Sequence, residues 1–188
     1  MKHKISYIVI AVLLLTSCSI TSHLPQGEVL YTGVSRIEHH LSDTVDASVR
    51  EDVATALEVQ PNSALLGSAY HMSPFPFGLW FYNGLYTDKE KGFRHWLWNT
   101  FKSDPTLVSQ VNPQLRARAA EAVLKDEGYF DAEVGYEVVA NPKDSLRARI
   151  AYDVTYRHQS RLGQITYLPT RRARIDSIVA HTLQSSLL

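Results

Sequence analysis

The chain has 188 residues, with 19 Lys and Arg balanced by 19 Asp and Glu, and 45% of its residues are hydrophobic. This composition is typical of a globular protein with one domain, or one domain and part of another, and the neutral balance argues against a general nucleic-acid binder. The single cysteine, Cys18, excludes an internal disulfide and a Cys-rich zinc site. The aromatic residues cluster, because all 3 Trp lie between Phe75 and Phe101.

Residues 1–17 have the layout of an export signal. Lys2 and Lys4 precede an apolar run, residues 5–15, that is interrupted only by Ser6. As a helix this run covers about 16 Å, too little for the roughly 30 Å of bilayer hydrocarbon. The sequence Leu15-Thr16-Ser17-Cys18 then resembles a bacterial lipobox, in which the cysteine becomes the first mature residue and carries lipid. The alternative is a buried or unused Cys18. Residues 18–27 are expected to be a tether.

A strand and a helix are predicted next. Residues 28–38 alternate as in a half-buried strand, and the expected inner face is Val29, Tyr31, Gly33, Ser35 and Ile37. The helix begins at Asp46 or at a capping box of Ser48 and Glu51, and it ends before Pro61-Asn62. Its predicted apolar face is Val49, Val53, Ala56 and Leu57.

Residues 61–111 form an aromatic-rich insertion. The prolines within residues 73–78 exclude a regular helix or central strand there, and residues 93–101 fit a helix with Phe93, Trp96, Leu97 and Phe101 on one face. Three interpretations stay open: packing between helices, a dock for a barrel or an inner-membrane-spanning component, and contact with the outer-membrane interface. The candidate membrane or partner contacts are Trp80, Phe93, Trp96, Trp98 and Phe101.

The clearest prediction is a helix followed by a β-hairpin. Asn112 suits the helix cap, Pro113 the first turn and Gly128 the exit, and the expected apolar face is Leu115, Ala119, Ala122 and Val123. Two alternating runs, residues 130–139 and 146–156, flank a turn at residues 141–144 and form a hairpin with one covered face. In the second run one face is expected to carry Leu146, Ala148, Ile150, Tyr152, Val154 and Tyr156, and the opposite, polar face Arg147, Arg149 and Asp153.

Residues 159–188 are expected to begin a second, incomplete domain. A strand is predicted at residues 161–168, and a helix from Thr170 has Ile175, Ile178, Val179 and Leu183 on one face. The basic run Arg171-Arg172-Ala173-Arg174 is interpreted as the solvent-exposed first turn of this helix, and the alternative is a binding site for an anionic partner.

This order of elements resembles the polypeptide-transport-associated (POTRA) domain, an α+β fold with a β-α-α-β-β unit and two helices on a small mixed sheet. The sequence from Leu124 to Val134 is similar to the passage from its second helix to its second strand, and residues 150–154 and 162–167 are similar to the strands that follow. The lipobox, residues 23–28, residues 62–67 and residues 75–80 together resemble the lipoprotein, TamL-like branch of the BamA/TamA outer-membrane assembly superfamily. Residues 28–158 would be the POTRA-like domain, with residues 61–111 inserted.

The resemblance implies a function in outer-membrane protein assembly or translocation. The chain would be a lipid-anchored module of a Gram-negative outer membrane, facing the periplasm, and a truncated form without the family's β-barrel. Its partners would be unfolded outer-membrane proteins or extended strands, and an inner-membrane-spanning TamB-like protein. Extended strands would add to the edge of the second strand, by β-augmentation, unless that edge is only solvated. The edge residues are Phe130, Ala132, Val134, Tyr136 and Val138. The alternative function is a scaffold that docks on a membrane partner through the aromatic segment.

Nothing in the sequence points to catalysis. The 8 His are scattered, and the doublet His39-His40 lacks a metalloprotease pattern. Nucleophile elbows and phosphate-binding glycine loops are missing too, and lipidation would consume Cys18. We therefore expect a non-enzyme without a cofactor or metal, and no nucleic-acid partner.

Overall fold

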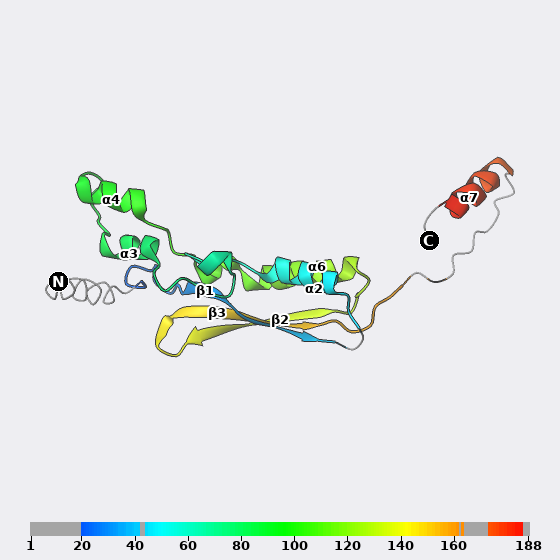
Figure 1. Ribbon diagram of the computed structural model, residues 1–188, viewed down its shortest axis with the longest axis horizontal. Coiled ribbons are helices and arrows are strands. Elements are labelled where there is room, and N and C mark those ends of the chain that lie inside the picture. Colours follow the sequence, from blue (N-terminus) through cyan, green and yellow to red (C-terminus); the bar gives the residue numbers. More distant parts are fainter. Residues whose placement is uncertain (1–19, 42–43, 162, 164–172, 186–188) are drawn as a thin grey trace, which may run out of the picture.

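The computed structural model describes residues 20–41, 44–161, 163 and 173–185. Helices α2 (Ala47–Leu57) and α6 (Pro113–Asp126) lie side by side on a sheet made of β1 (Leu30–His40), β2 (Glu133–Asn141) and β3 (Asp144–Thr155) (Figure 1). The insertion between the two helices carries the short 3-10 helix η1 (Leu65–Gly67) and the helices α3 (Phe77–Gly84), α4 (Phe93–Phe101) and α5 (Val108–Val111). The predicted α+β class, with helices on a small mixed sheet, is confirmed.

The sheet has the order β1-β3-β2, with β1 parallel and β2 antiparallel to the central β3. The hairpin prediction is confirmed, because β2 and β3 are joined by only Pro142 and Lys143. The Asn141 side chain closes this loop by accepting a hydrogen bond from the Lys143 N–H at 2.9 Å.

The predicted start of β2 at Phe130 is wrong by three residues. Gly128 ends α6 in the left-handed conformation, with φ of 88°. The chain then makes one more turn, in which the Ala132 N–H donates to the Tyr129 carbonyl at 3.2 Å. The strand therefore begins at Glu133, and Phe130 lies in the turn before it.

The expected alternation of β1 is broken by bulges. The pairing with β3 shifts between Tyr31 and Val34 and again between Val34 and Arg36, and Gly33 has φ of 121°. Tyr31 and Val34 are both fully buried and Ile37 packs against them, so the inner residues are three apart. The predicted alternating face is therefore wrong at Ser35, which is only half-buried: the bulges turn Val34 to the core and leave Gly33 buried against Ala69 and Tyr70 of the insertion.

The apolar face of α2 is confirmed, but its predicted capping box is not. Val49, Val53 and Leu57 are buried. Asp46 is the N-cap, without a side-chain hydrogen bond, and Ser48 lies inside the helix.

Helix α6 has the predicted ends and a different buried face. The Asn112 side chain accepts from the Leu115 N–H at 3.2 Å, and Pro113 is the first helical residue. The buried residues are Pro113, Ala117, Ala120 and Leu124. Leu115 is 59% exposed, so the predicted face is wrong. Both stripes have helical spacing, and the small Ala117 and Ala120 side chains allow α6 to pack closely in the core.

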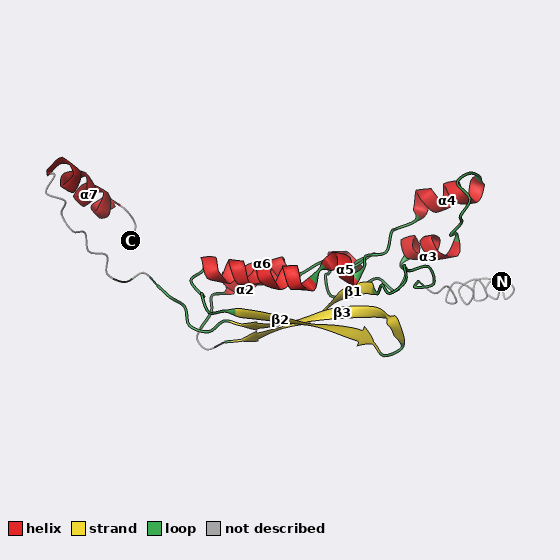
Figure 2. Cartoon of the chain, turned by 180° about the vertical axis from the view of Figure 1, so that it is seen from behind, coloured by secondary structure: helices red, strands yellow, loops and turns green. Residues whose placement is uncertain are grey.

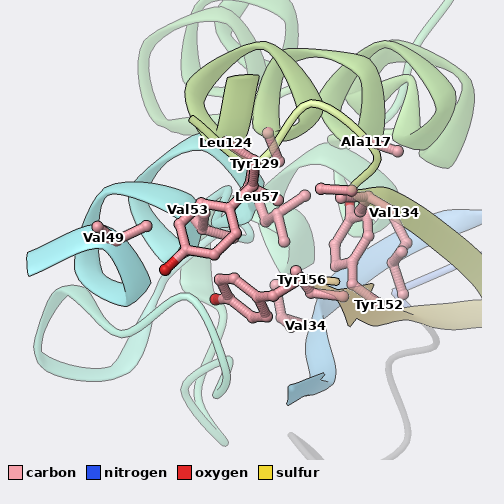
Figure 3. Packing of buried hydrophobic residues seen from close by; sticks show 14 of the residues in the cluster. Val34, Val49, Val53, Leu57, Ala117, Leu124, Tyr129, Val134, Tyr152 and Tyr156 are labelled. Atoms are coloured by element: carbon pink, nitrogen blue, oxygen red, sulfur yellow. The ribbon is translucent and has the colours of Figure 1, made fainter. Parts of the chain in front are cut away.

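The core lies between the two helices and the sheet (Figure 3). The predicted inward row of β3 is confirmed from Ala148 to Tyr156, since Ala148, Ile150, Tyr152, Val154 and Tyr156 are fully buried. The buried Tyr31 hydroxyl donates to the Val59 carbonyl at 2.8 Å. The Tyr152 hydroxyl has no hydrogen-bond partner among the described residues, and burial raises its pKa to about 12.

Some expectations fall outside the described residues. They are the export signal, Cys18 and most of the predicted strand at 161–168. The predicted C-terminal helix is observed as α7 (Ala173–Ser185), on which Ile175 and Ile178 are exposed. Among the described residues, no helix combines the length and the apolar character needed to cross a membrane.

Candidate functional site

The outer side of β2 is an open sheet edge. The Val134 N–H donates to the Glu121 side chain at 3.2 Å and so points away from β3. Backbone groups on a strand alternate in direction, so those of Tyr136, Val138 and Ala140 also point outward. Within the described part of the chain, no group hydrogen-bonds to the outward N–H and C=O of these three residues. The edge therefore offers unpaired donors and acceptors along about half of β2.

The outer side of β1 is closed over its first half by the insertion. The Val108 N–H donates to Val29 at 3.0 Å, and the Tyr31 N–H donates to Thr106 at 2.8 Å. Beyond the bulge, the Val34 N–H donates to the Ala69 carbonyl at 2.9 Å. Among the described residues, the insertion thus occupies the first half of the β1 edge and leaves the β2 edge from Tyr136 to Ala140 unpaired.

The predicted edge residues do not all line this edge. Ala132 and Val134 are buried beneath α6, and Phe130 precedes the strand. Tyr136 and Val138 are 43% and 44% exposed on the face that bears the helices. They remain accessible because the hairpin runs past the end of α6 (Figure 2). The apolar side chains available to a strand added at this edge are therefore Tyr136 and Val138.

Phe130 borders an open hollow at the start of β2. The hollow has a volume of about 460 Å³ and is lined by Lys125, Phe130, Asp131, Ala132, Glu133 and Arg157. An ion pair of 3.0 Å between Arg157 and Glu133 crosses its lining. Phe130 itself is 60% exposed. The hollow thus lies beside the strand edge and combines charged groups with one exposed ring.

The aromatic insertion folds into a hairpin of two helices, α3 and α4, which we call the aromatic hairpin (residues 75–104). Trp98 holds it together: its indole N–H donates to the Tyr82 carbonyl at 3.0 Å, and the Lys102 ammonium lies 4.1 Å from its ring centre. The rings of Phe81 and Phe101 add a contact at 5.4 Å. Packing between helices, one of the three interpretations of this segment, therefore explains Trp98 and, in part, Phe101.

Other aromatic rings of the hairpin face solvent. Phe93 and Trp96 are 74% and 55% exposed, and their rings stack on each other at 5.8 Å. Phe75 and Phe77 are also exposed, and they contact Trp80 edge to face. This much exposed aromatic surface on one small element is typical of an interaction site rather than of a solvated helix pair.

The segment expected to be a free tether is fixed to α3 from Ile20 onward. Ile20 is buried against Leu30 and Leu79. The buried Asn83 amide donates to the carbonyls of Ile20 at 3.0 Å and Leu79 at 2.9 Å. Its oxygen accepts from the His23 N–H at 2.9 Å and from the Ser22 hydroxyl at 3.1 Å. Asn83 thus uses the full hydrogen-bonding capacity of a primary amide.

The histidine doublet is divided between the two faces of the sheet. His39 Nδ1 lies 2.8 Å from the Tyr156 hydroxyl, and burial, with Arg50 and His40 nearby, lowers the pKa of His39. His40 instead lies beside Asp153 and Glu38 on the outer face, where one ligand atom from each falls within 4.8 Å of the others. Arg36 pairs with Glu38 at 2.8 Å and competes for that carboxylate.

Comparisons with protein-family models, with curated proteins and with solved structures find no match for this chain.

The residues that position these sites gave little signal in the sequence. Asn62 fastens the exit of the aromatic hairpin, donating to Asp104 at 2.8 Å and accepting from the Thr106 N–H at 2.6 Å. Arg149 binds the carbonyls of Val34 and Tyr70, both at 2.7 Å. Asn62 sits in a Pro-Asn pair that predicted only a helix stop. Arg149 sits in an alternating strand and was expected to remain on its polar face.

Proposed function

We propose that this protein is a lipid-anchored polypeptide-binding module, which accepts an extended segment of an unfolded outer-membrane protein as an added strand along β2. The observation that carries the proposal is the open β2 edge, with the outward groups of Tyr136, Val138 and Ala140 unpaired among the described residues. Backbone pairing requires little of the client's sequence, as expected for a module that handles many different chains.

Side chains beside the edge favour extended segments of a particular kind. Successive side chains of an added strand point to opposite faces of the sheet. Those on the helix-bearing face would lie next to Tyr136 and Val138, and those on the other face next to Gly135, Glu137 and the partly buried Val139. Segments of alternating apolar and polar residues match this arrangement, and the membrane strands of outer-membrane proteins have that pattern.

The anchor and the assembly come from the resemblance stated for the sequence. We propose that Cys18 carries the lipid, that the domain is of the POTRA type, and that it faces the periplasm of a Gram-negative bacterium. On this proposal the chain acts as a binding module and not as an enzyme, and a TamB-like protein is a further partner. Mass spectrometry of the mature N-terminus tests the lipid independently of any client.

The client proposal is tested by amide hydrogen exchange with and without an unfolded outer-membrane protein. We expect the outward amides of Tyr136, Val138 and Ala140 to gain protection, while the inward amides of β2 are already protected by β3. Unchanged exchange at these three amides with saturating client would refute augmentation at β2.

A pair of substitutions separates backbone pairing from side-chain contact. Val138→Pro removes one outward donor and, because that N–H does not bond to β3, leaves the β2–β3 ladder intact. Val138→Ala keeps the donor and removes most of the side chain. We expect Val138→Pro to weaken client binding much more than Val138→Ala. Equal effects of the two variants would point to a hydrophobic contact instead.

A further inference from the structure

The aromatic hairpin is attached to the start of the ordered chain, close to Cys18. Ile20 is 3% exposed and packs against Leu79 of α3, and the Asn83 amide holds the backbone from Ile20 to His23. Two peptide units separate Cys18 from Ile20, so their Cα atoms lie at most about 8 Å apart. A lipid on Cys18 would therefore hold Ile20 at a distance similar to the depth of the headgroup layer, about 5–8 Å on each side of the bilayer, with α3 packed against Ile20.

The position of α3 and α4 in the fold also supports a location close to the anchor. In Figures 1 and 2 the helices α3 and α4 extend beyond the end of the sheet, on the side where the described chain begins, and away from α2 and α6. The Thr21 hydroxyl also donates to Asp144 in the β-hairpin at 3.2 Å, so the chain leaving the lipid runs between α3 and the sheet. The first described residues thus contact α3 of the aromatic hairpin at the end of the sheet beyond which this hairpin projects.

The surface of the hairpin has the chemistry of a membrane interface. Phe75, Phe77, Phe93 and Trp96 expose their rings. Exposed charged side chains accompany them: Lys89 and Lys91 alternate with Asp88 and Glu90 just before α4, and Arg94 in its first turn leaves this stretch with one excess positive charge. Aromatic rings favour the boundary between headgroups and acyl chains, and Lys and Arg bind phosphates beside it. The rings of Phe77, Phe93 and Trp96 stand on two short helices, α3 and α4, that project beyond the sheet, and Phe75 directly precedes α3.

We propose that the aromatic hairpin docks on the phospholipid surface of the membrane that carries the lipid anchor, with the rings of Phe75, Phe77, Phe93 and Trp96 at the interface. Asn83 transmits this contact to the domain, because it fixes α3 to the segment that leaves the lipid. The hairpin and the anchor would then form two points of attachment and fix the orientation of the domain. This inference rests on the lipid-anchor part of the proposed function, and it is independent of client binding.

The test uses the native tryptophans, because all three, Trp80, Trp96 and Trp98, lie in the aromatic hairpin. The full protein, purified from membranes and with lipid on Cys18 verified by mass spectrometry, is placed in vesicles of phosphatidylethanolamine and phosphatidylglycerol. Matched vesicles carry bromine on the acyl chains near the headgroups. We expect tryptophan emission to be clearly lower in the brominated vesicles.

Two variants make the result specific. Phe75→Ser with Phe93→Ser keeps every tryptophan and removes two exposed rings from the hairpin, so we expect most of the quenching to be lost. Phe130→Ser is the matched control, because Phe130 is similarly exposed but lies beside β2, and it should leave quenching unchanged. Equal emission in ordinary and brominated vesicles, from protein whose Cys18 carries lipid, overturns membrane docking and assigns the rings to a protein partner. Client protection at β2 would be unaffected by that outcome.

Discussion

Replacing Asn83 with leucine should release the first ordered residues from α3 without unfolding the domain. Leucine has a similar size and is a good helix former, so α3 itself should persist. The variant removes all four hydrogen bonds of the buried amide. Two backbone groups then lose their partners, the His23 N–H and the Ile20 carbonyl. The Leu79 carbonyl keeps its bond within the helix.

The magnitude follows from the burial of these two groups. A buried backbone group left without a partner costs about 1–3 kcal/mol. His23 is exposed, so water replaces most of its lost bond, whereas Ile20 is buried and bears the larger part. We expect a local loss of about 2 kcal/mol, which corresponds to roughly thirty-fold faster amide exchange at His23.

Hydrogen exchange resolved to single amides measures this change. Amides of α2, α6 and β3 should keep their wild-type rates, because the four hydrogen bonds of the Asn83 side chain go to Ile20, Ser22, His23 and Leu79 and not to those elements. Asn99→Leu is the matched control: Asn99 is an exposed residue of α4, and its replacement should leave His23 exchange unchanged. If His23 exchanges at the wild-type rate in Asn83→Leu, the amide does not hold this segment, and the link between anchor and hairpin fails.

Two further pairs of substitutions test the packing of the sheet, with urea unfolding as the measurement. Gly33→Ala should lower the free energy of unfolding by about 2–4 kcal/mol, because φ is 121° and the new Cβ would lie 2.7 Å from the Ala69 carbonyl oxygen. Its control, Gly135→Ala, meets only ordinary van der Waals contacts and should change the free energy of unfolding by less than about 1 kcal/mol. Similar losses for both would show that the insertion does not press on β1. Tyr152→Phe should be neutral or stabilising by up to about 1 kcal/mol, because it removes a buried hydroxyl that has no hydrogen-bond partner among the described residues. Tyr31→Phe should instead destabilise the domain by about 1 kcal/mol, because the Val59 carbonyl loses its donor. Equal losses from the two tyrosine variants would contradict this account.

Local patterns predicted the elements of the core domain better than their faces. The proline and asparagine at the start of α6, Gly128 at its exit and the two alternating runs after it each act over a few residues, so the sequence carries them directly. The buried stripe of α6 depends on which of two helical stripes meets α2 and the sheet. That choice is made by long-range packing, where Ala117 and Ala120 permit a closer approach than Leu115.

The same division between local patterns and long-range packing holds for the candidate sites. The edge position of β2 was expected from the resemblance, and the strand order agrees with it. The closure of the β1 edge was not foreseen, because it depends on Ala69 and Thr106, which lie far from β1 in sequence and use only backbone atoms. The sequence placed the aromatic residues in one segment, but only the fold separates the internal Trp98 from the exposed Phe93.

The insertion connects the two candidate surfaces through hydrogen bonds. Its backbone closes the outer edge of β1, and Arg149 of the central strand binds it through Tyr70. Its helix α3 holds the segment that follows Cys18, and Thr21 of that segment reaches Asp144 at the β2–β3 turn. If the aromatic hairpin rests on the membrane, the turn end of β2 lies toward the membrane and the Glu133 end away from it. A strand added along β2 would then have one end near the bilayer and the other end away from it, as the proposed function requires of a segment that is to enter the membrane.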